Sequence, residues 1–474
     1  MNPASRRTFL RQMAASIPTV VCGASFRSLG QSGPSALAPR AWITSSDRKY
    51  SRFSVPSWQE SSLSAGAAIE IDPSQQFQTV LGFGGAFTDS SCYLLSRMEP
   101  SARRHVLEEL YGDNGLRLSL GRTCIGSSDY SLTTYTFDDT AAPDPELKHF
   151  GIGHDRSYIL PVLREALELR PDLFLFATPW SPPAWMKSGD SLRGGNMRKE
   201  YFQPYAEYFV KFLQAYQAAG VTVSAVTVQN EVDTDQDGKM PAALWGQEYE
   251  AGFIKGFLGP ALRNASFDTR IWLLDHNFDL WGRVLDMLSD PEVYKYVDGV
   301  AWHGYAGRPD AMTKVHNAFP EKSAYWTEGG SFVTDPDFET NWAKWSATYA
   351  QLFKNWSRSA VAWNLVLNEK GGPNLGPFTC GGVVTVNSKT QELTRSGLYW
   401  ALAHYAKNVR RGARVIATTA PPDSVEHVAF ENPDGGFAAV FANQGAERDV
   451  ICSFEAKSTT FTMPQNSVVT LEWS

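Results

Sequence analysis

The sequence predicts an α/β protein: a (β/α)8 TIM barrel with an all-β sandwich side domain formed by both chain ends. Two patterns lead to this prediction. Strand-like runs alternate with helical stretches through the middle of the chain, and polar and apolar residues alternate near both ends. The length agrees with two units, because 474 residues exceed what one hydrophobic core normally holds.

The middle of the chain contains eight strand-like runs, the number that a closed barrel of parallel strands requires. Helical stretches separate several of them, and over 201–219 apolar residues recur at the spacing of an amphipathic helix. An open doubly wound sheet is the alternative, but its glycine-rich nucleotide-binding turn is incomplete at Gly82–Phe87. The expected strands are Val80–Phe83, Leu116–Leu120, Leu173–Ala177, Val223–Val228, Ile271–Leu274, Val297–Trp302, Ser323–Thr327 and Ser359–Leu365.

The sequence near both ends of the chain predicts short strands separated by turns. The alternation is clear at Ala67–Asp72 and again in several runs after Gly412, where turns such as Asn432–Gly436 interrupt it. We therefore expect residues 41–76 and 409–474 to form one β-sandwich, and residues 77–408 to form the barrel.

The N-terminal residues have the features of an export signal. Arg6 and Arg7 precede Phe9 and a modest apolar run, which is a twin-arginine pattern, and Pro18 interrupts a run already too short to span a bilayer. A disordered tail with two chance arginines is the alternative. We expect a signal peptide over 1–30, a flexible linker over 31–40, a periplasmic or extracellular location, and no transmembrane segment.

Composition narrows the class of protein. The formal net charge is -7 and no Lys/Arg-rich stripe is present, so we expect no nucleic-acid partner. The 5 cysteines show no CxxC spacing, which argues against a structural zinc site. The four cysteines beyond the signal are expected to be buried thiols, because twin-arginine substrates fold in a reducing cytoplasm. Aromatic residues make up 13% of the chain, and sugar sites often use such rings.

Two glutamates directly follow predicted barrel strands. Glu231 comes after the fourth strand and Glu328 after the seventh, and catalytic residues of such barrels lie at the C-terminal ends of strands. A pair of carboxylates can cleave a glycosidic bond, one as a proton donor and one facing the sugar carbon. Their separation would distinguish retention, at about 5–5.5 Å, from inversion, at about 6.5–9.5 Å. Taken alone, either glutamate could be an ordinary surface residue.

Further polar and aromatic residues follow the other predicted strands. Each has an ordinary structural explanation by itself: an aspartate can cap a helix, a tryptophan can belong to the core, and a histidine can be structural. Together they are typical of a sugar-binding rim. They are Asp89, Arg122, Trp180, His303, Tyr305 and Trp363.

Several stretches resemble the motifs of glycoside hydrolase family 30, the glucosylceramidase (glucocerebrosidase-like) family, in the family's order. The similarity extends from about Ile69 to the end of the sequence. It implies a (β/α)8 barrel with a β-sandwich, a retaining double displacement through a covalent glycosyl-enzyme, and no metal or other cofactor. The matching stretches are Gly82–Asp89, Ile125–Ser131, Tyr135–Asp139, Trp180–Lys187, Thr227–Glu231 and Asn364–Asn374.

The resemblance also implies roles for single residues. Glu231 matches the family's acid/base, Glu328 its nucleophile, and Asn230 the residue that bonds the sugar 2-hydroxyl. Gly304 stands where glucosylceramidases often carry a bulky aromatic residue, which would open one wall of the site. Residues matching the terminal sugar subsite are Asp89, Trp180 and Trp363, and those matching its surroundings are Arg122, His303, Tyr305 and Asn374.

The expected chemistry sets conditions on the two glutamates. Burial or repulsion from Glu328 should raise the pKa of Glu231, so that it can donate a proton near neutral pH. Glu328 should remain ionised, which requires hydrogen-bond donors, and Tyr305 or Arg122 could supply them.

These observations predict a retaining β-glycosidase acting on a β-linked glucoside, in a glycolipid or an oligosaccharide, with glucosylceramide as the favoured substrate. An endo-β-1,6-glucanase or β-xylosidase of the same family, and a carbohydrate-binding protein without activity, are the alternatives. A metal-dependent barrel hydrolase would need a His-x-His pair after the first strand, and a serine hydrolase a GxSxG elbow. The sequence contains neither.

Overall fold

The computed structural model describes residues 39–61 and 66–474. The expected export signal, and residues 31–38 of the expected linker, lie outside the described residues. Arg40, which we expected to end the linker, instead begins strand β1 (Arg40–Thr44). None of the described helices is long and apolar enough to cross a membrane.

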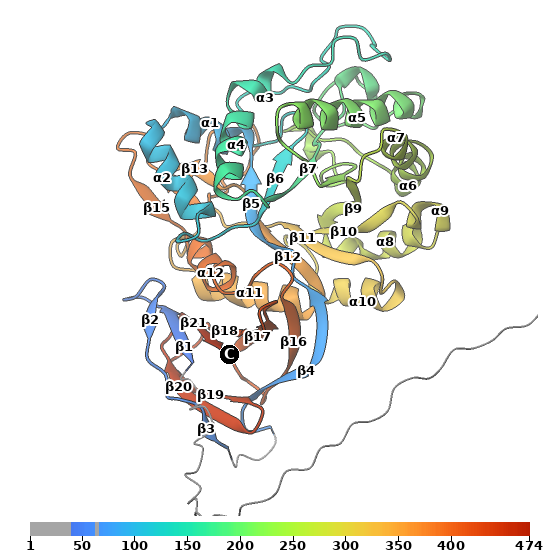
Figure 1. The fold of residues 1–474 in the computed structure, drawn as a ribbon. Helices are drawn as coiled ribbons and strands as arrows, with labels where there is room; N and C mark the ends of the chain where they lie inside the picture. The colour runs from blue at the N-terminus through green and yellow to red at the C-terminus, as the bar shows by residue number, and fades with distance from the viewer. Residues whose placement is uncertain (1–38, 62–65) are drawn as a thin grey trace, which may run out of the picture. The chain divides into compact units, whose positions relative to one another are not determined.

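Eight parallel strands form a closed barrel, which confirms the predicted fold class (Figure 1). The strands follow chain order around the barrel, and β12 pairs with β5 to close it. They are β5 (Gly82–Phe87), β6 (Leu120–Cys124), β7 (Phe174–Thr178), β8 (Ala225–Thr227), β9 (Arg270–Asn277), β10 (Val297–His303), β11 (Ser323–Glu328) and β12 (Ser357–Ala362).

The first two strands begin two to four residues later than predicted. In β5 the strand includes the glycine-rich stretch that resembled a turn. A Cβ atom on Gly84 would lie 2.1 Å from the carbonyl oxygen of Leu120, so glycine is required where β5 and β6 approach each other. The predicted boundaries follow runs of β-branched residues. The pairing of β5 with β6 depends instead on a glycine, which has no side chain to obstruct it.

Helices cover the outside of the barrel between successive strands (Figure 1). The predicted helix at 201–219 is α5, which buries Tyr205, Tyr208 and Phe209 on one face. The helices are α1 (Asp89–Arg97), α2 (Pro100–Tyr111), α3 (Gly153–Ser157), α4 (Ile159–Leu169), α5 (Phe202–Ala218), α6 (Gln247–Phe253), α7 (Gly259–Asn264), α8 (Trp281–Leu288), α9 (Pro291–Tyr294), α10 (Asp310–Ala318), α11 (Trp342–Lys354) and α12 (Gly397–Ala406).

A layer of apolar side chains fills the barrel interior. Trp272 of β9 stacks on Tyr325 of β11 with ring centroids 4.0 Å apart, and Phe176 of β7 packs on the same indole. The interior of the barrel is therefore a packed core, and we expect the active site beyond the strand ends.

Both ends of the chain form the β-sandwich, as predicted (Figure 1). Strand β1 pairs with β21, and β4 passes from the sandwich directly toward β5 of the barrel. The sandwich strands are β1, β2 (Ser51–Phe53), β3 (Gln59–Glu60), β4 (Ile69–Thr79), β16 (Arg414–Thr419), β17 (Glu426–Glu431), β18 (Phe437–Asn443), β19 (Arg448–Phe454), β20 (Lys457–Met463) and β21 (Ser467–Trp473). A small separate sheet contains β13 (Val366–Asn368), β14 (Val384–Val386) and β15 (Leu393–Arg395).

The four cysteines of the described residues are buried and unbonded, as expected for thiols. They are Cys92, Cys124, Cys380 and Cys452.

Candidate active site

The barrel strands converge on a buried arginine at their C-terminal ends. Arg122 of β6 is fully buried and donates hydrogen bonds to Glu328, to Asn230 Oδ1 at 2.7 Å and to Asp275 Oδ2 at 2.9 Å. Its guanidinium also lies 4.8 Å from the ring centroid of Trp180. One side chain thus contacts groups from β9, from β11 and from the loop that follows β8.

Asp275 of β9 is a buried carboxylate that contacts both Arg122 and His303. Burial alone would raise the pKa of its carboxyl, but Arg122, His303 and Thr327 stabilise the charged form and lower that pKa well below its usual range. Thr327 donates to Oδ1 at 2.7 Å, while the hydroxyls of Thr178 and Thr227 donate to Oδ2 at 2.9 and 2.8 Å. We call this strand-end group the floor: Arg122, Asn230, Asp275, His303 and Glu328.

Glu328, the last residue of β11, has donors on both carboxylate oxygens. Arg122 donates to Oε2, and the Tyr305 hydroxyl donates to Oε1 at 3.1 Å. Both donors expected from the sequence are therefore in place.

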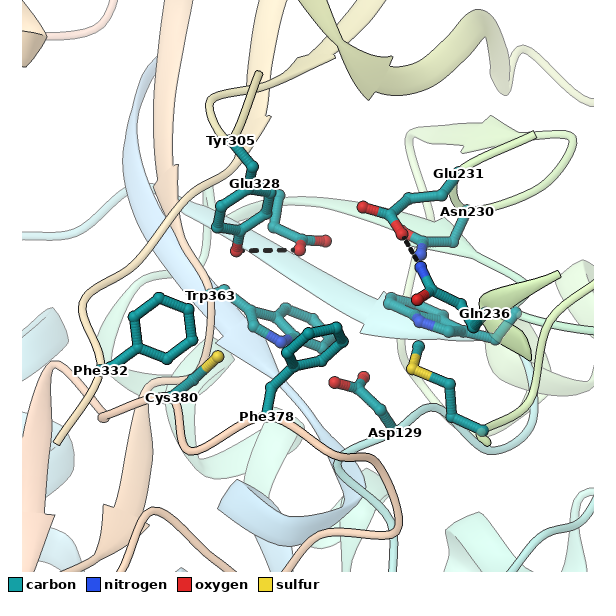
Figure 2. Close-up of a pocket in the computed structure, with 12 residues that line it drawn as sticks. Asp129, Asn230, Glu231, Gln236, Tyr305, Glu328, Phe332, Trp363, Phe378 and Cys380 are labelled. Carbon is teal, nitrogen blue, oxygen red and sulfur yellow. Dashed lines mark hydrogen bonds between the residues drawn. The ribbon is translucent and has the colours of Figure 1, made fainter. Parts of the chain in front are cut away.

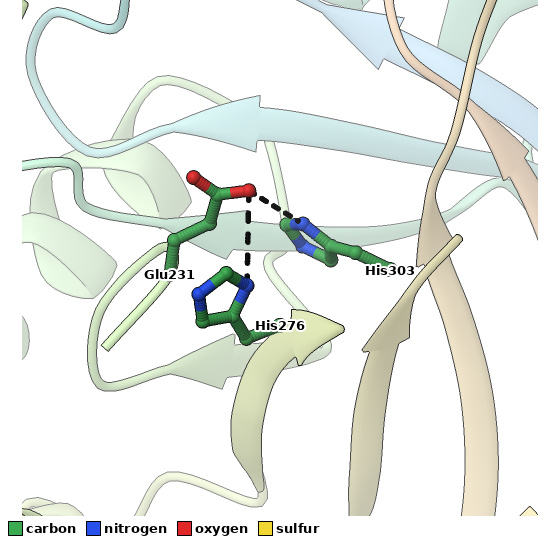
Figure 3. A group of neighbouring side chains, drawn as sticks. All are labelled: Glu231, His276 and His303. Atoms are coloured by element: carbon green, nitrogen blue, oxygen red, sulfur yellow. Dashed lines mark ion pairs between the residues drawn. The ribbon is translucent and has the colours of Figure 1, made fainter. Parts of the chain in front are cut away.

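Glu231 stands opposite two imidazoles (Figure 3). Its Oε1 lies 3.4 Å from His303 Nδ1 and 3.8 Å from His276 Nδ1, while the amide of Gln236 donates to Oε2. Burial pushes the pKa of Glu231 upward, but His303, His276 and Arg122 outweigh it, and the net pKa is lowered. The expectation of a raised pKa is wrong for this state, because nearby histidines stabilise the anion more than burial destabilises it.

His303 holds the compensating positive charge. Burial alone would lower its pKa, but the carboxylates of Glu328, Asp275 and Glu231 raise it to about 9. Its Nε2 lies 3.0 Å from Asp275 Oδ1 and 3.7 Å from Glu328 Oε2. At neutral pH both nitrogens of this imidazole are therefore protonated, and the charged ring lies between the two glutamates.

A cavity of about 220 Å³ opens above the floor (Figure 2). Glu231 and Glu328 both point into it, and Trp180 and Trp363 stack on each other along its side, with centroids 5.1 Å apart. Tyr305 also lines the cavity. Loops supply the remaining lining residues, which we call the wall: Asp129, Gln236, Met240, Phe332, Phe378 and Cys380.

Asp129 is the unusual member of the wall. Its side chain is buried, Oδ1 has no hydrogen-bond partner among the described residues, and burial together with the charges of Glu328 and Glu231 raises its pKa well above normal. A buried acceptor at the edge of a cavity is suited to a hydroxyl group of a ligand.

The structure brings eight of the ten predicted site residues to the floor, its edge or the cavity, and places Asp89 and Asn374 elsewhere. The carboxylate of Asp89 accepts from Tyr158 Oη at 2.6 Å and from the Leu132 amide at 2.8 Å, and lies 2.7 Å from His154 Nε2. Asn374 donates to the carbonyls of Gly371 and Phe378, so it shapes a wall loop. Neither lines the cavity.

Gly304 does not widen the cavity as expected. A Cβ atom there would lie 2.9 Å from Nε1 of Trp326, so the missing side chain leaves space for the indole of Trp326 in β11.

Sequence reasoning missed four polar residues of the site. Asp275 and His276 directly follow the apolar residues of the fifth predicted strand, so the rule applied to the other strands would have found them. Asp129 lies inside a stretch that matched the family's motifs. Gln236 belongs to an irregular loop, and no comparable signal marks it.

Comparison with known proteins agrees with this geometry. The family model described as "Glycosyl hydrolase family 30 TIM-barrel domain" matches residues 80–409, and "Glycosyl hydrolase family 30 beta sandwich domain" matches residues 412–471. An endo-1,6-beta-D-glucanase of Neurospora crassa is 33% identical over 462 residues, covering 92% of this chain and 95% of the relative. The lysosomal acid glucosylceramidase of Mus musculus is 30% identical over 419 residues, covering 83% and 81%.

A solved endo-beta1,6-glucanase has the same fold, with a TM-score of 0.83 and 31% identity over 92% of this chain and 99% of that one. The chain therefore belongs to glycosyl hydrolase family 30 and is a glycoside hydrolase.

Proposed function

We propose that this enzyme hydrolyses a β-glucosidic bond with retention of configuration, through a covalent glycosyl-enzyme. The observation that carries the proposal is the contrast between the two glutamates that face one cavity. Glu328 accepts from an arginine and a tyrosine, which suits a nucleophile that must remain ionised. Glu231 faces histidines that can exchange a proton with it, which suits an acid/base.

In the proposed first step, Glu328 attacks the anomeric carbon while Glu231 protonates the leaving oxygen. The proton is held on His303 in the free enzyme and moves to Glu231 as the sugar excludes water from the cavity. Once the nucleophile is glycosylated its charge is lost, so the pKa of His303 falls and Glu231 can accept a proton from the attacking water.

For the substrate, we propose a β-1,6-linked glucan. Similarity to endo-1,6-β-glucanases over nearly the whole chain supports it, in sequence and in fold. Glucosylceramide is the second candidate, since Met240, Phe332 and Phe378 give the wall an apolar surface and glucosylceramidases are also relatives.

Initial rates on a β-1,6-glucan, glucosylceramide, a β-xylan and an aryl β-glucoside would rank the substrates. NMR of the first product would test the mechanism: we expect the β-anomer, and initial release of the α-anomer would refute retention. A protein that bound these sugars without turnover would instead be a binding protein.

We also propose export through the twin-arginine route. Support comes from Arg6, Arg7 and the apolar run that follows them. Replacing both arginines with lysine should retain the enzyme in the cytoplasm, as measured by cell fractionation. Unchanged export would contradict the proposal.

A further inference from the structure

We propose that Glu231, His276 and His303 form a binding site for one divalent transition-metal ion, such as Zn²⁺, and that binding of the ion inhibits the enzyme. The ligand atoms would be Glu231 Oε1 and the Nδ1 atoms of both imidazoles. The inhibition, but not the binding, rests on the proposed acid/base role of Glu231.

The spacing of the three atoms fits a metal. Oε1 lies 3.4 and 3.8 Å from the two Nδ1 atoms, and each of the three residues can offer one ligand atom within 4.8 Å of the other two. Ligands of tetrahedral zinc, with bonds of about 2.0–2.1 Å, are separated by roughly 3.3 Å. Figure 3 shows both rings directed toward the same carboxylate. Small side-chain rotations would complete the geometry.

Each imidazole is already oriented by a carboxylate on its far side. His276 Nε2 lies 3.0 Å from Asp233, and His303 Nε2 lies 3.0 Å from Asp275. Such a carboxylate holds the proton on Nε2 and leaves Nδ1 for a metal, as in carboxylate–histidine–zinc sites. Both Nδ1 atoms belong to buried histidines, 7% and 0% exposed, and neither has a hydrogen-bond partner among the described residues.

Charge also favours a cation. Four carboxylates surround the two rings, those of Glu231, Asp233, Asp275 and Glu328. Arg122 contacts Asp275 and Glu328, and the positive charge of Arg283 acts on Asp233. The ion would replace the proton on His303, and the surrounding carboxylates would still attract the bound cation. Because Glu231 lines the cavity, the ion can enter from it, and a fourth ligand position would face the substrate.

The consequence for catalysis is direct. An ion bound to Oε1 occupies the lone pair that must carry the proton to the leaving oxygen. Turnover should therefore stop while the ion is bound and resume when a chelator removes it.

The binding test uses the full chain after chelator treatment. We expect calorimetry with ZnCl₂ to show one high-affinity site, and Co²⁺ to give the absorption of a tetrahedral complex. His276→Gln should weaken zinc binding about 100-fold. Asp233→Asn, which keeps all three ligands, should weaken it about 10-fold by releasing the ring orientation. His105→Gln, on the exposed part of α2, is the matched control and should bind as the wild type does.

Equal zinc affinity in His276→Gln and His105→Gln, with circular dichroism showing both folded, would overturn the site. The inhibition test measures hydrolysis of an aryl β-glucoside against zinc concentration, and we expect competitive, chelator-reversible inhibition. Tight binding without inhibition would leave the site standing and remove the acid/base role of Glu231. If the wild type bound no zinc and Glu231→Gln lost activity, the catalytic role of Glu231 would stand and the zinc site would be refuted.

Discussion

The floor and the wall of the cavity are built in different ways. The floor comes from barrel strands and the residues that directly follow them, and its charges are matched by hydrogen bonds among Arg122, Asp275, His303 and Glu328. The wall comes from loops, is largely apolar, and contains in Asp129 a buried carboxylate oxygen without a partner. The difference suggests that the floor performs the chemistry and the wall selects the substrate.

Removing the nucleophile should give the largest effect. We expect Glu328→Gln to lower kcat by at least about 10⁴-fold, because no covalent intermediate can form. Sugar binding, measured by calorimetry, should persist because the wall is unchanged. Wild-type turnover in this variant would refute the assignment of Glu328 as the nucleophile.

Removing the central anion of the floor should reduce both stability and rate. Asp275→Asn leaves Arg122 and His303 with one carboxylate fewer, and breaking a buried ion pair costs about 3–5 kcal/mol. The pKa of His303, about 9 in the native protein, should fall, which moves the alkaline limb of the kcat/KM profile to lower pH.

Thr327→Val is the control for that change. It removes one hydrogen bond to Asp275 and leaves the charge in place, so the alkaline limb should stay near its native position. An equal shift in both variants would show that packing, not charge, sets the pH dependence.

Within the wall, Asp129→Asn should act on substrate binding. A buried polar group left without its hydrogen-bond partner costs about 1–3 kcal/mol, so we expect KM to rise about 10- to 100-fold with little change in kcat. Asp89→Asn is the matched comparison, because its carboxylate binds Tyr158 and Leu132 outside the cavity. It should lower the melting temperature and leave KM unchanged; the reverse pattern would favour the original assignment of Asp89.

Phe378 tests whether the wall distinguishes long substrates from short ones. Its ring is 39% exposed at the cavity. Phe378→Ala should raise KM for the preferred natural substrate about 3- to 10-fold, the scale of a partly exposed aromatic contact, and hardly change KM for an aryl β-glucoside. Equal effects on both would mean that Phe378 contacts the terminal sugar.

The smallest effect concerns the loop that carries Asp129. Asp138 belongs to the same connection between β6 and α3. It is buried near Asp144, and burial is the main cause that raises its pKa to about 6. Ionisation thus disfavours the fold: stability falls as pH rises from about 4 toward 6. Asp138→Asn should stabilise the protein above pH 6 by about 1 kcal/mol after solvent screening, and not below pH 4. Melting temperatures at pH 4 and pH 7 would show this; equal changes would contradict it.

The sequence predicted the fold well, because the barrel and the sandwich depend on local patterns. Strands β9, β10 and β11 follow apolar, β-branched or aromatic runs and begin within one residue of the prediction. The misplaced β5 shows the limit, since its glycines are selected by contact with β6, which no local pattern reveals.

The sequence predicted the floor of the site better than it predicted the wall. Floor residues follow strands, so strand ends identify them, and Asp275 could have been found in the same way. Wall positions depend on tertiary contacts: the Tyr130 hydroxyl donates to the Phe378 carbonyl and accepts from the Cys380 amide, which places that loop over the cavity. The lowered pKa of Glu231 depends on a 3.4 Å approach to His303, which spacing along the chain cannot supply.

The pairing of β1 with β21 joins segments that flank the entire barrel in the chain. At ribosomal rates of about 5–20 residues per second, β1 must wait tens of seconds for its partner. The barrel strands can therefore assemble before β1 has its partner. The sandwich can be completed only after β21 has been synthesised. If the enzyme is exported in the folded state, as proposed above, closure of the sandwich would be the last folding step before transport.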